Sequence, residues 1–304
     1  MGRTDLGGQA VIEGVMMKGP KHYAVAVRQA DGTITLDVKP SVSLLDKHKF
    51  FKLPIIRGIV VFAESLIIGT KTLTYSAELL EDETDTESKF EMWLREKLGE
   101  RTENILLALT MCLSVMLSIT IFMLIPMWIS QLFKNAVSSS FALNLVEGVF
   151  RIVIFLLYMK LMSNMNDIQR TFQYHGAEHK TINCLEQDKE LTVENVKQCT
   201  RLHKSCGTSF LFIVMVVSIL VLSVFTTDSL IVRTATRIAM VPIISGISYE
   251  FIRWARKNSD NTIANFVSKP GMWLQREFTT IEPDDKQIEV AIAAVKGVLD
   301  SENN

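Results

Sequence analysis

The amino-acid sequence predicts a mainly α-helical, polytopic membrane protein with about four transmembrane helices and a small cytoplasmic α+β part. Two observations predict the membrane class: 48% of the residues are hydrophobic, and they are concentrated in long blocks with few charges. A third observation predicts the β part, because apolar and polar residues alternate on both sides of an Asp-Gly pair near the N-terminus. The net charge of −1 gives no electrostatic footprint for nucleic acid.

Residues 1–53 are predicted to form a cytoplasmic segment around a β-hairpin whose turn is Asp31-Gly32. The preceding stretch Gly7–Pro20 is rich in glycine but matches neither the dinucleotide-binding nor the phosphate-loop fingerprint. It is either a loop that closes over a site, with Glu13 inside, or a short strand bounded by glycines.

Residues 54–80 are predicted to be an interfacial or re-entrant helix, because the apolar part is short and contains Arg57 and Glu64. Residues 81–103 read as an acidic linker. Its run of Asp and Glu is expected to be solvated rather than to bind metal.

Residues 104–163 are predicted to contain transmembrane helices one and two, and residues 208–252 helices three and four. Helices one and three lie in Asn104–Ser130 and Thr208–Phe225, which carry no charge. The first of these runs exceeds the roughly 20 residues that a helix needs to cross a bilayer.

Helices two and four are apolar but contain charged residues, which are rare in membrane spans and mark pairing or function. Helix two has Glu147 and Arg151, and helix four has Arg233 and Arg237 near its start. A buried helical hairpin of a soluble protein is the alternative for these two segments. Within a membrane we expect the four groups to pair with one another, although the surplus of arginine also suits an anion site.

The lysines and arginines predict the orientation, because basic residues gather on the cytoplasmic side. The connection between helices one and two has only Lys134, whereas the central loop 164–207 and the C-terminal segment 253–304 are basic next to the membrane. Both termini and the central loop are therefore predicted to be cytoplasmic. The C-terminal segment should contain a short helix that stops at Pro270 and a last amphipathic helix that begins near Pro283.

Three of the five histidines lie in the central loop, together with three of the four cysteines. His175 and His179 are spaced i, i+4, so on a helix both imidazoles face one side and can bind one metal ion. Glu178 completes His-x-x-Glu-His, the inverted zinc metallopeptidase pattern, in which the glutamate acts as general base.

A second cluster follows at Cys199, His203 and Cys206, which share one helical stripe if Glu194–Ser205 is a helix. Four ligands would make a closed structural site, and three ligands plus water would make a catalytic one. The predicted ligands of the metal are His175, His179, His203 and Cys206. The metal expected first is zinc, with iron second. The alternative to a metal site is that the cysteines pack as small apolar residues and the histidines form hydrogen bonds in the loop.

Two further carboxylates are candidates for catalysis beside Glu178. Glu13 lies in the glycine-rich stretch. Glu250 should lie at the cytoplasmic end of helix four, on the same side of the membrane as His175.

Several motifs resemble those of the YqhQ-like family, a group of bacterial integral membrane proteins described as predicted metal-dependent enzymes. The resemblance spans nearly the whole chain and rests on residues 7–17, Tyr-His-Gly-Ala-Glu-His-Lys at 174–180, His203 with Cys206–Phe210, Gly246–Glu250, and Thr279-Thr280 with Glu282-Pro283. It departs from the pattern at Lys204-Ser205, where the family has Pro-Arg. The resemblance implies a metal and a bacterial inner (cytoplasmic) membrane, but no substrate.

The sequence as a whole favours a metal-dependent hydrolase acting at the membrane, with the lipid bilayer as its environment and a lipid-linked substrate or another membrane protein as its partner. A non-catalytic assembly factor with a structural metal is one alternative. A transporter that uses the charges of helices two and four is another.

Overall fold

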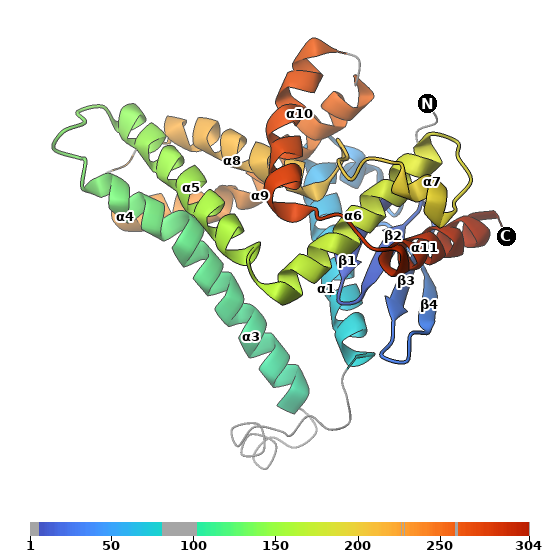
Figure 1. Ribbon diagram of the computed structural model, residues 1–304. Helices are drawn as coiled ribbons and strands as arrows, with labels where there is room; N and C mark the ends of the chain where they lie inside the picture. The colour runs from blue at the N-terminus through green and yellow to red at the C-terminus, as the bar shows by residue number, and fades with distance from the viewer. Residues whose placement is uncertain (1–5, 81–101, 226, 228, 259–260, 304) are drawn as a thin grey trace. The chain divides into compact units, whose positions relative to one another are not determined.

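The computed structural model describes residues 6–80, 102–225, 227, 229–258 and 261–303, which separate into two compact units (Figure 1). The sheet unit comprises residues 1–80, 158–218 and 240–304, and the helical unit comprises residues 81–157 and 219–239. Of the acidic linker predicted at 81–103, residues 81–101 lie outside the described residues.

The N-terminal segment forms a four-stranded antiparallel meander with the order β1-β2-β3-β4. Its strands are β1 (Gly7–Val11), β2 (Gly14–Lys18), β3 (His22–Arg28) and β4 (Ile34–Pro40). The predicted hairpin is β3–β4, and Gly32 in its turn has a φ of 88°, which glycine adopts without steric cost. Of the two alternatives for the glycine-rich stretch, the strand is the one observed, because β1 and β2 pair through a two-residue turn at Ile12 and Glu13.

Helices cover both faces of this sheet because successive strand residues point to opposite sides. Val15 and Met17 of β2 pack with α6 (Asn166–Glu186) and α11 (Asp285–Asn303) in one core cluster. Met16 faces the other way, towards Ile68 and Tyr75 of α1 (Ile56–Glu78). The 3.6-residue pattern predicted for the last helix is confirmed, because its apolar positions are buried in this core: Ile288, Ala291, Ile292, Val295 and Val298.

The turns η1 (Leu44–Asp46) and η2 (Lys49–Lys52) lead from the sheet to α1. Within the sheet unit, α1 approaches the C-terminal half of α9 (Leu230–Lys257) closely. A Cβ atom at Gly58 would lie 2.8 Å from the Cα atom of Gly246, so the two backbones are in contact. Next to this contact Arg57 of α1 forms a two-pronged ion pair with Glu250 of α9.

The four predicted membrane helices are present, and each is long and apolar enough to cross a bilayer. They are α3–η4–α4 (Thr102–Ile119, Thr120–Leu124 and Ile125–Gln131), α5 (Ser140–Met162), α8 (Gly207–Val224) and α9. The first exposes large apolar side chains along its length, for example Leu109, Leu113 and Met116. Water would penalise such a surface and lipid would not, so the chain is a membrane protein.

The condition that would place Cys199, His203 and Cys206 on one helical stripe is not met, because α7 (Val193–Lys197) ends well before Ser205. Side chains of α6 bind the carbonyl groups that a longer helix would need. Asn183 Nδ2 donates to the carbonyls of Thr200 and Leu202 at 2.7 and 3.2 Å. Residues 198–206 therefore run as an irregular segment along α6.

The helix stop predicted at Pro270 is wrong, because α10 (Thr262–Leu274) continues through this residue into the π-turn η5 (Gln275–Thr279). Close packing holds α10 at the start of α8. A Cβ atom at Gly271 would lie 2.7 Å from the Cα atom of Ser209.

Candidate metal centre

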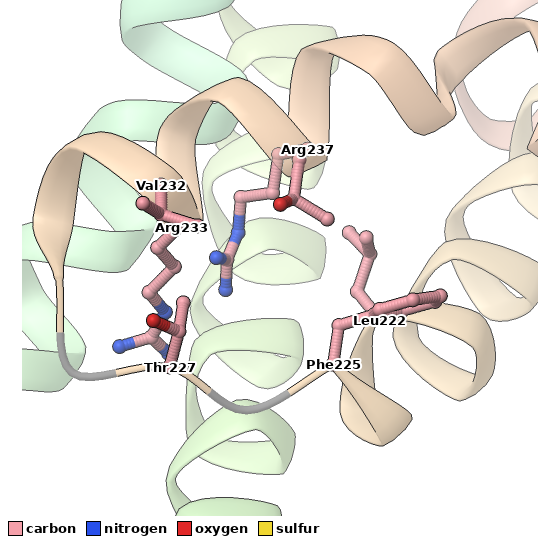
Figure 2. Close-up of a pocket in the computed structure, with 7 residues that line it drawn as sticks. Leu222, Phe225, Thr227, Val232, Arg233 and Arg237 are labelled. Atoms are coloured by element: carbon pink, nitrogen blue, oxygen red, sulfur yellow. The ribbon is translucent and has the colours of Figure 1, made fainter.

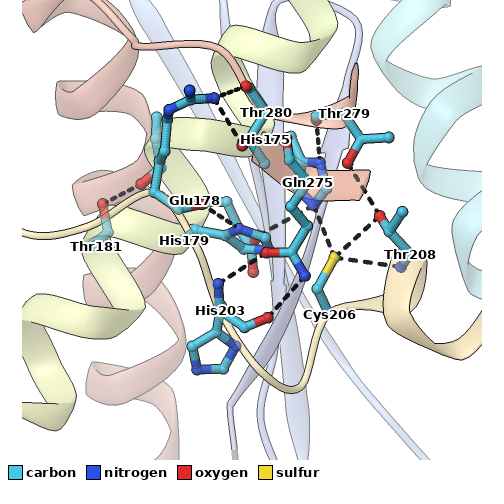
Figure 3. A network of polar contacts seen from close by, with 12 residues as sticks. His175, Glu178, His179, Thr181, His203, Cys206, Thr208, Gln275, Thr279 and Thr280 are labelled. Atoms are coloured by element: carbon cyan, nitrogen blue, oxygen red, sulfur yellow. Dashed lines mark hydrogen bonds and ion pairs between the residues drawn. The ribbon is translucent and has the colours of Figure 1, made fainter. Parts of the chain in front are cut away.

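The two histidines of the His-x-x-Glu-His pattern project from the same side of α6. The ring centroids of His175 and His179 are 4.3 Å apart, as the i, i+4 spacing predicts. Cys206 approaches them from the residue before α8, with its Sγ atom 3.3 Å from His175 Nε2 (Figure 3). One ligand atom from each of the three residues lies within 4.8 Å of the others.

Backbone carbonyls orient both imidazoles. His175 Nδ1 lies 2.7 Å from the carbonyl oxygen of Thr279, and His179 Nδ1 lies 2.8 Å from that of Arg201. A carbonyl oxygen only accepts a hydrogen bond, so each Nδ1 carries the proton and donates it. In the neutral ring the lone pair is then on Nε2, the atom that faces the cluster. Metal-binding histidines typically donate their other ring N–H to such a carbonyl, which fixes the tautomer and the ring orientation.

The Cys206 thiol is buried in a polar environment that favours the thiolate. The Thr208 N–H donates to Sγ at 3.4 Å, and the Thr208 hydroxyl lies 3.3 Å from it. Burial alone would raise the pKa of Cys206, but the charge and hydrogen bonds of His175 and His179 hold it well below its usual value. Burial likewise opposes the charge of His175, yet the Cys206 thiolate and Glu178 raise the pKa of that imidazole to about 9. The thiolate is the form of cysteine that binds metals.

Glu178 completes the cluster from its buried side. Its Oε2 atom lies 3.4 Å from His179 Nε2 and 4.0 Å from His175 Nε2. Only 3% of the residue is exposed. Strand β1 passes directly over it, since a Cβ atom at Gly8 would lie 2.6 Å from Glu178 Cγ. A glycine at this position leaves the space that the carboxylate occupies.

His203, the fourth predicted ligand, does not join this group. Its ring points away from the Cys206 sulfur in Figure 3, and its Nε2 atom lies 3.4 Å from Glu186 Oε2. Burial lowers the pKa of His203, but hydrogen bonding to Glu186 raises it above the usual value overall. Its backbone N–H donates to Gln275 Oε1 at 2.9 Å. His203 is held by these contacts beside the site.

The comparisons with known proteins cover this whole cluster. A family described as "Protein of unknown function (DUF1385)" matches residues 53–301. The chain belongs to the DUF1385 family. The uncharacterized protein YqhQ of Bacillus subtilis (strain 168) is 38% identical over 299 residues, which cover 96% of this chain and 92% of YqhQ. No solved structure matches the chain. The resemblance to YqhQ is thereby confirmed, and all three converging residues lie within the DUF1385 match.

The two other candidate carboxylates of this DUF1385 protein are bound to arginines. Glu13 forms a two-pronged ion pair with Arg170 and accepts a hydrogen bond from the Tyr174 hydroxyl at 3.2 Å. Its backbone has a φ of 50°, which is unfavourable for a residue with a side chain. Glu250 pairs with Arg57. Neither belongs to the group of converging ligand atoms among the described residues.

Several residues that support the DUF1385 site give no metal-binding signal in the sequence. Gln275 is buried and binds both the N–H and the carbonyl of His203, the latter at 2.9 Å. Arg201 donates to the carbonyl of Thr280, and Lys180 pairs with Glu282. The only hint in the sequence is indirect, since residues 279–283 are among the motifs that carry the family resemblance.

Proposed function

We propose that this protein is a metal-dependent hydrolase that acts at the membrane, with a divalent cation bound by His175, His179 and Cys206. The observation that supports this most directly is the convergence of two Nε2 atoms and one thiolate sulfur, with a carboxylate beside them. Two imidazoles and a thiolate suit zinc first and iron second. Three protein ligands leave one position open, as in catalytic zinc sites, whereas structural sites use four.

The chain supplies a proton acceptor at the site. When bound, a zinc ion lowers the pKa of a coordinated water to about 7 and polarises a carbonyl or phosphoryl oxygen. Glu178 accepts the proton at Oε2, the oxygen closest to His179 Nε2, and returns it to the leaving group. His175 and His179 stay in one orientation because Thr279 and Arg201 hold their Nδ1–H groups.

The position of Cys206 favours a membrane-embedded or lipid-linked substrate. This residue directly precedes Gly207, the first residue of the membrane helix α8. Helix α10 of the same unit exposes Ile263, Phe266 and Trp273. An amphipathic helix with exposed aromatic residues is suited to the lipid–water boundary, where Trp is enriched. A substrate held in the bilayer could thus reach the site through its headgroup.

Glu178→Gln tests the catalytic role. The variant should retain near-stoichiometric metal, because Glu178 is not among the converging ligands, and should lose hydrolysis because the amide does not accept the proton. Purified protein in nanodiscs of bacterial total lipid extract is incubated and the lipid products are followed by mass spectrometry. Wild type should form hydrolysis products that Glu178→Gln does not. Glu186→Gln is the matched control, since Glu186 contacts His203 outside the cluster, and it should remain active.

The contrary outcomes of this experiment are distinct. Equal products from wild type and Glu178→Gln would remove Glu178 from the mechanism. Another outcome is that wild type forms no products and that the visible spectrum of the cobalt-substituted protein shows no titration of a metal-bound water near pH 7. These two results together would indicate a closed structural site.

We further propose that both termini face the cytoplasm in a bacterial cytoplasmic membrane, as the distribution of lysines and arginines supports. A fluorescent protein fused to the C-terminus should then fold and fluoresce. Alkaline phosphatase fused after Ala136, between α4 and α5, should be active because it is exported. The reverse pattern would overturn the orientation.

A further inference from the structure

The helical unit contains four buried charged side chains with a surplus of positive charge. Glu147 and Arg151 come from α5, and Arg233 and Arg237 from α9. Glu147 Oε1 accepts from Arg151 Nη2 at 2.7 Å and from Arg237 Nε at 2.9 Å. Its Oε2 atom accepts from Arg233 at 3.1 Å and from Arg237. The mutual pairing expected from the sequence is therefore present, but one carboxylate serves three guanidinium groups.

Two further groups among the described residues stabilise this cluster, and both are uncharged. Asn144 Oδ1 accepts from Arg233 at 2.6 Å. The carbonyl of Phe122 accepts from Arg151 Nε at 3.0 Å. These bonds satisfy N–H groups without reducing the charge. The described part of the cluster thus keeps a surplus of about two positive charges, and buried ionised groups in a membrane require compensation.

Two cavities adjoin the arginines. The larger, of about 360 Å³, is lined by Arg233 with Lys134, Asn144, Ser138, Ser140 and Thr227 among others. The smaller, of about 180 Å³, lies between Phe225, Arg233 and Arg237 (Figure 2). The described lining of both contains no Asp or Glu, so its polar side chains offer positive charge, hydroxyl groups and two amides.

Within the described part of the chain, Arg233 has donor groups left for a ligand in these cavities. One terminal nitrogen, Nη2, makes the hydrogen bonds to Asn144 and Glu147. Among the described residues, no protein acceptor contacts the Nε and Nη1 groups of Arg233. The rigid guanidinium fork matches two oxygens of a phosphate group.

We propose that these cavities form a binding site for a phosphate group, with Arg233 as its main ligand and Lys134 and the hydroxyl groups around it. A phosphate carries one to two negative charges near neutral pH, which matches the surplus of the cluster. Arg233 lies close to the first residue of α9, and Ser140 begins α5, so the site is near the ends of these spans. A soluble phosphate ion and the headgroup of an anionic lipid share this chemistry.

The test measures the melting temperature of the full chain in nanodiscs of neutral phosphatidylcholine. Inorganic phosphate is added in one arm, with chloride at equal ionic strength as its reference. Phosphatidylglycerol replaces part of the neutral lipid in a second arm without phosphate. A ligand that binds only the folded state raises the melting temperature, so at least one arm should show a rise in wild type. The arm that responds identifies the source of the phosphate group.

Arg233→Gln should remove the rise, and in the neutral discs without added inorganic phosphate it should melt no lower than wild type, because it reduces the surplus charge. Arg28→Gln is the matched control, since it removes an arginine from the sheet unit and should keep the rise. If Arg233→Gln does not fold, Lys134→Gln should still reduce the response. A wild type that responds in neither arm, or an Arg233→Gln protein with the full response, would overturn the site.

Discussion

Replacing His179 with alanine is expected to abolish stoichiometric zinc binding by the purified protein. The variant loses one of the three converging ligands and keeps only His175 and Cys206. Changes to residues that merely orient a metal ligand already weaken binding roughly 10–100-fold, so loss of the ligand itself should weaken it by at least about 100-fold. The measurement is metal content by plasma mass spectrometry after dialysis, followed by competition with a chromophoric chelator.

His203→Ala is the matched control for this experiment. His203 is the same residue type and its ring centroid lies only 5.7 Å from that of His179, but its Nε2 atom faces Glu186. It should therefore keep near-stoichiometric zinc. Equal loss of zinc in both variants would mean that His203 is a ligand and that the site is closed. A folded wild type without metal, purified without chelators, would reject the proposed centre.

The parts of this site that the sequence predicts are those set by local geometry. His175 and His179 lie together because residues four apart share one face of a helix, whatever the tertiary structure is. The membrane helices follow in the same way from the length of their apolar runs. Their charged residues also follow, since Glu147 and its three arginines had few alternatives to pairing with one another.

The parts that the sequence did not predict depend on contacts between distant segments. Glu13 and Glu250 were candidates for catalysis because carboxylates are common bases, and their arginine partners are 157 and 193 residues away in the chain. His203 shares a helical stripe with Cys206 only if residues 194–205 are helical, and carbonyl bonds from α6 prevent that helix. The carbonyls that orient His175 and His179 have no side-chain signature at all.

Replacing Gly176 with alanine is expected to destabilise the sheet unit although it lies in a helix. A Cβ atom at this position would lie closer than 3.0 Å to the carbonyl oxygen of Ile281, which is backbone. Alanine gains about 0.8–1 kcal/mol over glycine from helix propensity alone. Overpacking typically costs about 1–3 kcal/mol, and a backbone neighbour has few ways to relax, so the steric term should exceed the propensity gain.

The same substitution should weaken the metal centre by moving the carbonyl that orients His175. The Ile281 N–H donates to the carbonyl of Phe172 at 3.0 Å, which holds residues 279–282 against α6. Displacing this segment moves the Thr279 carbonyl away from His175 Nδ1, so zinc affinity should fall roughly 10–100-fold. Thermal unfolding and chelator competition measure the two effects.

Gly207→Ala is the control for packing, because Gly207 is a helical glycine too, at the first residue of α8, and a Cβ atom there would meet nothing within 4 Å. It should leave the melting temperature unchanged or slightly raised. If Gly176→Ala behaved in the same way, residues 279–282 would not lie against α6. The imidazole of His175 would then lack the carbonyl that fixes its tautomer, and the argument for Nε2 as the ligand atom would fail with it.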